Sequence, residues 1–195
     1  MFTHDLKPLV RRLLLAGAFS IGASACAFAQ SASDTRIGVG TPVTKAELSK
    51  YFAIPPDGTG LPAGSGTPSE GRVVFMDNCA ICHGDKLQGN PKPGFGGDRL
   101  IGGRGTLATN APVKTVESYW PYATTLFDYV KRAMPFSAPG SLTDDQVYSV
   151  VAFILAQGHI IKPDATMNAK TLPKVQMPNR NGFVPDPRPE LSLYH

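Results

Sequence analysis

The chain has 195 residues, with 19 Lys or Arg and 15 Asp or Glu, and a formal net charge of +4. The basic residues are dispersed, which excludes a nucleic-acid-binding surface, and three cysteines are too few for a disulfide framework. The length suits one domain, while 20 Gly and 18 Pro predict long irregular segments around a small ordered centre.

Residues 1–29 have the pattern of a cleavable export signal. An apolar stretch at 13–25 and a small-x-small site at 27–29 follow the basic residues Lys7, Arg11 and Arg12. The apolar stretch is short, so a membrane span in the mature chain is not expected. Cleavage after residue 29 removes three of the 19 basic residues and one of the 15 acidic residues, so the mature chain has a net charge of +2. A lipidated Cys26 is the alternative.

Residues 30–66 form an extended N-terminal segment rich in Gly and Pro, with a short helix expected at 45–51. Thr67, Pro68 and Glu70 then form a capping box with proline at the first helical position, which predicts a helix over 68–78. Gly71 would let this helix cross a later one closely, with Phe75 near Val150 or Phe153.

Cys79, Cys82 and His83 form the run Cys-x-x-Cys-His directly after this helix. Two thiols at this spacing can add to the vinyl groups of one haem while the adjacent imidazole reaches the iron. A thioredoxin-like pair or half of a zinc site are the alternatives, but no second cysteine pair exists and Cys26 lies far upstream. The motif therefore predicts one covalently bound c-type haem.

Two further helices are expected, over 122–132 and from Thr143 to Gly158. Asp128 and Arg132 form an i,i+4 pair in the first, and Pro135 prevents its continuation. The second begins with a capping box and carries apolar residues at helical spacing. Three helices without alternating strands predict an all-α domain.

The iron needs a second axial ligand, and Met134 is our candidate because it lies 51 residues after His83, just beyond a helix end. His159 is the second choice. Met76 is too close to the motif to reach the other haem face, and Met167 and Met177 suit core packing; His195 is the remaining candidate. A Met/His pair leaves no open iron position, which favours electron transfer over catalysis.

Other side chains are expected to surround the haem. The apolar candidates are Phe75, Leu87, Leu100, Trp120, Leu126 and Tyr129, and the candidate propionate donors are Arg104, Trp120 and Tyr122. The alternative for Trp120 is plain core packing. The Pro-rich tail at 161–195 is expected to wrap the core or dock a partner, a flexible tail being the alternative.

The haem motif, Met134-Pro135 and the apolar helix after Ser141 resemble a class I cytochrome c over residues 67–160. A narrower resemblance is to the cytochrome c subunits of bacterial sulfite and sulfane dehydrogenases of sulfur-oxidation systems. The segments that carry it are Pro56-Asp-Gly-Thr-Gly-Leu-Pro62, Gly102-Gly-Arg-Gly-Thr-Leu107, Tyr119-Trp-Pro-Tyr-Ala-Thr-Thr-Leu126 and Leu172-Pro-Lys-Val-Gln-Met-Pro-Asn-Arg180.

The narrower resemblance implies a periplasmic, non-catalytic subunit that accepts electrons from a molybdenum subunit and passes them to a downstream cytochrome c or oxidase. It also implies interface or propionate roles for Arg104 and Tyr122. Many class I cytochromes have a proline after the haem motif whose carbonyl orients the ligand histidine. Pro91 and Pro93 leave open which residue is its equivalent in this chain. A freely diffusing electron carrier and a haem enzyme or sensor with an open iron position are the competing functions.

Overall fold

The computed structural model describes residues 42, 44, 53–92 and 96–186. Four helices occur in this part of the chain: α2 (Pro68–Asn78), α3 (Ala80–His83), α4 (Ala123–Ala133) and α5 (Asp144–Gln157). The three predicted helices are confirmed to within one residue at each end, and α3, which holds the haem motif, is additional. The expected signal sequence and the short helix at 45–51 lie outside the described residues.

The helix ends follow from the sequence. Thr67 and Thr143 each accept a hydrogen bond from the backbone N–H three residues on, and the side chains of Glu70 and Gln146 each accept one from the backbone N–H of the cap residue. Both are complete capping boxes, which satisfy N–H groups that the first helical turn leaves unpaired. Gly158 caps α5 at φ −79°, and the left-handed conformation falls on the next residue, His159, at φ 53°.

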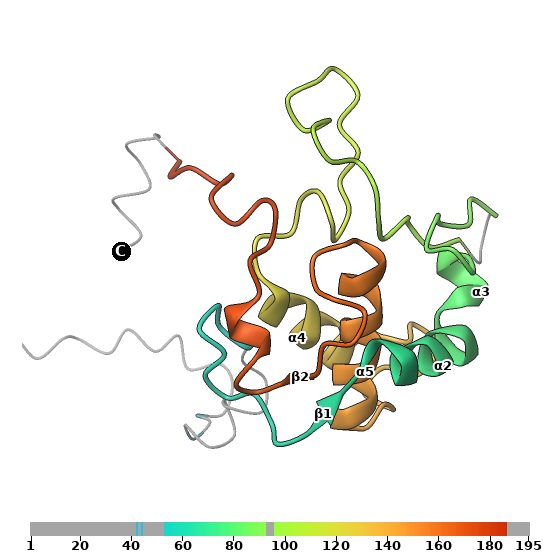
Figure 1. Cartoon of the computed structure of the whole chain (residues 1–195), viewed down its shortest axis with the longest axis vertical. Helices are drawn as coiled ribbons and strands as arrows, with labels where there is room; N and C mark the ends of the chain where they lie inside the picture. The colour runs from blue at the N-terminus through green and yellow to red at the C-terminus, as the bar shows by residue number, and fades with distance from the viewer. Residues whose placement is uncertain (1–41, 43, 45–52, 93–95, 187–195) are drawn as a thin grey trace, which may run out of the picture. The chain divides into compact units, whose positions relative to one another are not determined.

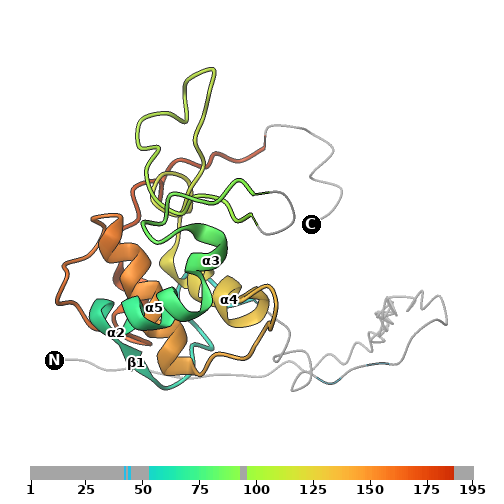
Figure 2. The same cartoon turned by 90° about the vertical axis from the view of Figure 1, so that its right-hand side faces the viewer.

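Helix α5 is the centre of the fold. Its residues from Val147 to Ala156 are all buried, because α2, α4 and the strand segments pack around it. Figures 1 and 2 show α5 between α2 and α4. Gly71 makes the α2–α5 crossing close, since a Cβ there would lie 1.8 Å from the Ser149 carbonyl oxygen. Phe75 then packs on Phe153 with ring centroids 5.2 Å apart, as the sequence predicts.

The segments that flank the haem domain pack onto these helices. The Ile54 amide donates to the Asp128 carboxylate at 3.0 Å, and the Tyr148 hydroxyl donates to the Pro62 carbonyl at 2.9 Å. Burial raises the pKa of Tyr148 to about 12, with a smaller contribution from Asp144. The phenol therefore keeps its proton and this hydrogen bond at every physiological pH.

Two short strands join the flanks. β1 (Ser65–Gly66) pairs antiparallel with β2 (Met167–Asn168), and a 3₁₀ turn, η1 (Leu172–Lys174), follows in the tail. The all-α prediction holds for the haem domain, to which this pair is a small addition. Among the described residues no helix is long and apolar enough to cross a membrane.

Candidate functional site

The Cys-x-x-Cys-His run forms a single helical turn at the end of α2. The Cys79 amide still donates to the Phe75 carbonyl of α2 at 2.8 Å, while the Cys79 carbonyl accepts from Cys82 and His83 at 3.1 and 2.9 Å. The two thiols and the imidazole therefore extend from one turn of backbone. Burial, with a smaller effect of Cys82, raises the pKa of the Cys79 thiol to about 11. Both cysteine side chains are partly buried.

The loop after α3 donates hydrogen bonds to the carbonyls at the C-terminal end of this helix. The Asn90 side chain donates to the Ile81 carbonyl at 3.0 Å, the Gly97 amide to the Cys82 carbonyl at 2.9 Å, and the Gly89 amide to the His83 carbonyl at 2.8 Å. Helix ends leave such carbonyls without intrahelical partners. The loop therefore fixes the motif at the C-terminal end of α3.

The ring of His83 is oriented by the same loop. Its Nδ1 lies 2.6 Å from the carbonyl oxygen of Asp98, a distance at which Nδ1–H donates and Nε2 is left with its lone pair available. Gly97 permits this approach, because a Cβ there would come within 2.9 Å of Nδ1 and 3.0 Å of the Cys82 carbonyl oxygen. The orienting carbonyl is thus that of Asp98 rather than that of a proline.

The candidates for the second axial ligand lie in different environments. Met134 is the C-cap residue of α4, in extended backbone at φ −123°, and its partly buried side chain packs on the same core as Cys79. Met167 and Met177 are buried in that core, Met76 is 40% exposed on α2, and His159 is exposed beyond α5. His195 lies outside the described residues.

The apolar side chains expected around the haem form one continuous group. Phe75, Leu87 and Leu126 are buried in the core, and Leu100 and Trp120 pack against it. The Trp120 ring meets the half-exposed Tyr129 ring edge-on at 5.6 Å between centroids. Cys79, Met134 and all of these apolar candidates except Tyr129 therefore contact one core.

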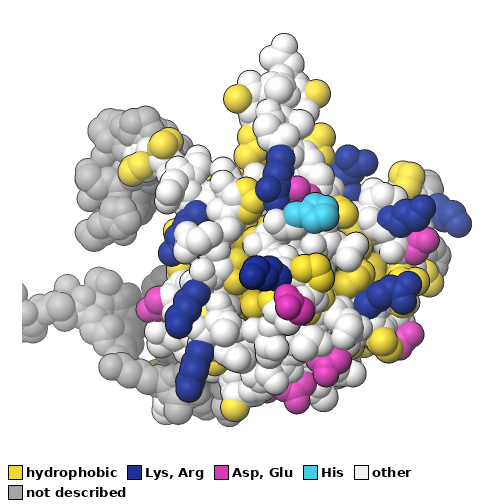
Figure 3. All heavy atoms as spheres, viewed as in Figure 1, with side chains coloured by type: hydrophobic (Ala, Val, Ile, Leu, Met, Phe, Trp, Pro, Cys, Tyr) yellow, Lys and Arg dark blue, Asp and Glu magenta, His cyan; other side chains and the backbone are white. Residues whose placement is uncertain are grey.

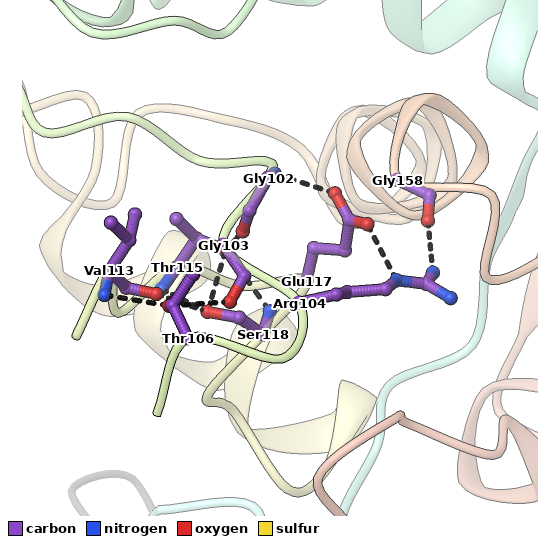
Figure 4. A network of polar contacts seen from close by, with 9 residues as sticks. All are labelled: Gly102, Gly103, Arg104, Thr106, Val113, Thr115, Glu117, Ser118 and Gly158. Carbon is purple, nitrogen blue, oxygen red and sulfur yellow. Dashed lines mark hydrogen bonds and ion pairs between the residues drawn. The ribbon is translucent and has the colours of Figure 1, made fainter. Parts of the chain in front are cut away.

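Arg104 and Tyr122 have other partners in the structure. Arg104 Nε lies 2.6 Å from Glu117 Oε1, and Nη2 donates to the Gly158 carbonyl at 2.5 Å (Figure 4). The Arg180 guanidinium lies 5.3 Å from the centroid of the Tyr122 ring. The propionate role remains a prediction for both residues, and the contacts recorded for Arg104 tie the 102–118 loop to the end of α5.

Sequence reasoning missed three residues of this site: Gly97, Asp98 and Glu117. The Gly-rich run at 94–97 was the available signal for the first two, because a backbone that must approach a ring closely needs glycine. Glu117 had no local signal, since its partner Arg104 is thirteen residues away in an irregular loop.

Comparison with known proteins identifies the family. The family described as cytochrome c matches residues 68–157. A chain in the crystal structure of the sulfane dehydrogenase SoxCD from Paracoccus pantotrophus is 39% identical, with a TM-score of 0.68, and the match covers 82% of this chain and 78% of that one. The chain belongs to the cytochrome c family. No curated protein matches this cytochrome.

The residues present fit the haem c that members of this family bind covalently. Cys79 and Cys82 supply the Cys-x-x-Cys-His thiols on one helical turn, and the backbone around His83 engages Nδ1, leaving Nε2 for iron. Among the described residues no group of three or more His, Cys, Asp or Glu side chains could hold a metal ion by itself. As a member of the cytochrome c family, this protein carries covalently attached haem c and transfers electrons.

Proposed function

We propose that this cytochrome accepts electrons one at a time from the molybdenum subunit of a sulfite or sulfane dehydrogenase and passes them to a periplasmic cytochrome c or oxidase. The similarity to a chain of SoxCD supports the proposal, because it covers 82% of the chain whereas the family match is confined to residues 68–157. The likeness therefore extends into the flanks, which a haem domain alone does not require.

The residue roles in this proposal are as follows. Cys79 and Cys82 would hold the haem by thioether bonds, and His83 through Nε2 and Met134 through sulfur would bind its iron. Bound haem would supply one-electron chemistry between ferrous and ferric iron. The Asp98 carbonyl oxygen accepts a hydrogen bond from Nδ1–H of His83, which would make Nε2 a better electron donor to iron, while a thioether ligand would raise the reduction potential.

Two side-chain ligands would leave the iron no open position, which suits an electron relay rather than an oxygen-activating or peroxide-activating centre. Oxidation of the sulfur compound then belongs to the partner, and this subunit is non-catalytic. Export by the signal at residues 1–29 places the mature chain in the periplasm, where haem attachment takes place.

The deciding experiment is co-expression with the molybdenum subunit encoded by the same organism. We expect the two proteins to co-purify and the haem to be reduced within the mixing time by sulfite or a sulfane donor, but not when the molybdenum subunit is omitted. A cytochrome that purifies alone and is reduced equally by unrelated dehydrogenases would show the freely diffusing carrier instead.

A further inference from the structure

A loop extends from the helices between residues 102 and 118 (Figures 1 and 2). It is held by its own polar contacts. Thr106 is central, because its hydroxyl donates to the Gly103 carbonyl at 2.7 Å and accepts from the Val113 amide at 2.9 Å. At the base Thr115 donates to the Gly102 carbonyl at 2.7 Å.

The loop is also fixed to the rest of the domain. Glu117 Oε2 accepts the Gly102 amide at 2.6 Å while Oε1 binds Arg104, which reaches the Gly158 carbonyl (Figure 4). Ordering a loop costs conformational entropy, and a loop ordered before binding does not incur that cost on association. A preformed loop that projects from the core is therefore suited to contact another molecule.

The Pro-rich tail runs beside this loop. The Asn179 side chain donates to the Tyr119 carbonyl at 2.7 Å, and the Phe183 ring meets the Tyr119 ring edge-on at 5.2 Å. A hollow of about 300 Å³ separates the two segments, with Arg104, Leu107 and Ala108 on one side and Pro178 and Asn179 on the other. Phe183 is nevertheless 52% exposed and Val184 84% exposed.

Charge is divided sharply between this region and the rest of the described chain. Segments 99–122 and 170–184 contain six basic residues and one acidic residue, Glu117, a net charge of +5. The other described residues contain six basic and ten acidic residues, a net charge of −4. Lys114 and Arg180 stack on Tyr119 and Tyr122, and neither has an ion-pair partner among the described residues.

The loop tip itself carries no charge. Residues 105–112 contain only Gly, Thr, Leu, Ala, Asn and Pro, and Figure 3 shows the projecting tip without acidic or basic side chains. An uncharged centre beside a charged rim is the usual composition of a protein–protein interface. A net positive surface repels a second copy of itself, so the complementary occupant is an acidic protein face.

We propose that the surface formed by residues 104–114, Tyr119 and 178–184, the docking surface, binds an acidic face of the electron-donating subunit. The identity of that subunit rests on the proposed function. The loop tip and Phe183 supply the apolar contact, and Lys114 and Arg180 supply the attraction that steers the encounter. The base of the loop follows Leu100 and precedes Trp120, and both pack on the core that Cys79 and Met134 also contact.

The test compares two double variants of equal charge change. Lys114→Glu with Arg180→Glu reverses the docking surface, and Arg72→Glu with Lys162→Glu reverses two exposed cations outside it. At low ionic strength we expect the first to reduce the rate constant of haem reduction by the molybdenum subunit on the order of tenfold or more, and the second to leave it near wild type. At high salt the rate constants of the two variants should become similar, because ions screen the charges.

A second pair of variants tests the apolar contact. Phe183→Ala should raise the dissociation constant several-fold, whereas Val73→Ala, at a 62% exposed position on α2, should not. Unchanged haem spectra and potentials establish that each variant is folded. A wild-type protein that the molybdenum subunit neither binds nor reduces overturns the proposed function and with it this choice of partner. If the haem is reduced at equal rates in both double variants, or if the docking-surface variant loses only a homodimer, the docking surface is overturned while the proposed function stands.

Discussion

Substitution of Gly97 by alanine tests the orientation of His83 most directly. The new Cβ would lie 2.9 Å from Nδ1 and 3.0 Å from both Cε1 of that ring and the Cys82 carbonyl oxygen. Ordinary contacts of this kind begin near 3.5 Å, so the loop must move away by about half an ångström. The 2.6 Å hydrogen bond from Nδ1 to the Asp98 carbonyl is the contact that this movement weakens.

The expected magnitude follows from that bond. Its loss removes about 1 kcal/mol of net hydrogen-bond energy, and the overpacking adds about 1–3 kcal/mol, so unfolding should become easier by about 2–4 kcal/mol. A weaker Nδ1 hydrogen bond makes the imidazole a poorer electron donor, which destabilises ferric iron. If about 1 kcal/mol of the bond favours the ferric form, the reduction potential rises by about 40 mV.

Potentiometric titration and denaturant unfolding measure the two effects on the haem-loaded protein. Gly158→Ala is the matched control, because its φ is −79° and a Cβ there meets its nearest atoms at 3.4 Å and beyond, which is ordinary contact. It should change neither quantity appreciably. A folded Gly97→Ala protein whose potential equals that of the wild type, or lies below it, would refute the reasoning.

Three other substitutions test the remaining assignments. Met134→Ala should allow the ferrous protein to bind carbon monoxide at neutral pH, while wild type and the core variant Met177→Ala should not; binding by wild type would contradict Met134 ligation. Gly71→Ala places a Cβ 1.8 Å from a carbonyl oxygen of α5 and should lower stability by about 3 kcal/mol in thermal or denaturant unfolding, with an unchanged haem spectrum if the domain still folds. The pKa of Glu70 is lowered by hydrogen bonds from the Thr67 side chain and backbone, so its contribution to stability is present above pH 4.5, the ordinary pKa, and is lost as pH falls through the lowered value. Glu70→Gln keeps the cap without a titrating group and should flatten that part of an acid-unfolding curve; an identical curve would count against the cap.

The contribution of the flanks is measurable in the same complex. Truncation after residue 178 keeps the buried core residues Met167 and Met177 and removes the outer tail, including the contacts of Asn179 with Tyr119 and of Arg180 with Tyr122. The haem domain should keep its spectrum, while binding to the molybdenum subunit should weaken. Undiminished co-purification would show that the tail serves only the fold.

The sequence by itself determined the features whose physics is local. Both capping boxes, the helix bounds and the spacing of the Cys-x-x-Cys-His run depend on residues within a few positions of one another. Hydrogen bonds and steric limits at that range act whatever the rest of the chain does. The same holds for the choice of haem c, since both thiols and the histidine lie within five residues.

Only the tertiary structure decided which distant groups meet. Asp98 reaches His83 across fifteen residues, Arg104 reaches Gly158 across fifty-four, and Asn179 reaches Tyr119 across sixty. Each contact lies in irregular chain, where no helical or strand period restricts the direction of a backbone group. Arg104 illustrates the difference, because its type suits a propionate and only the fold shows it paired with Glu117. The packing of the loop after α3 therefore determined how the His83 ring is oriented, and the packing of the tail beside the 102–118 loop determined which side chains lie together there.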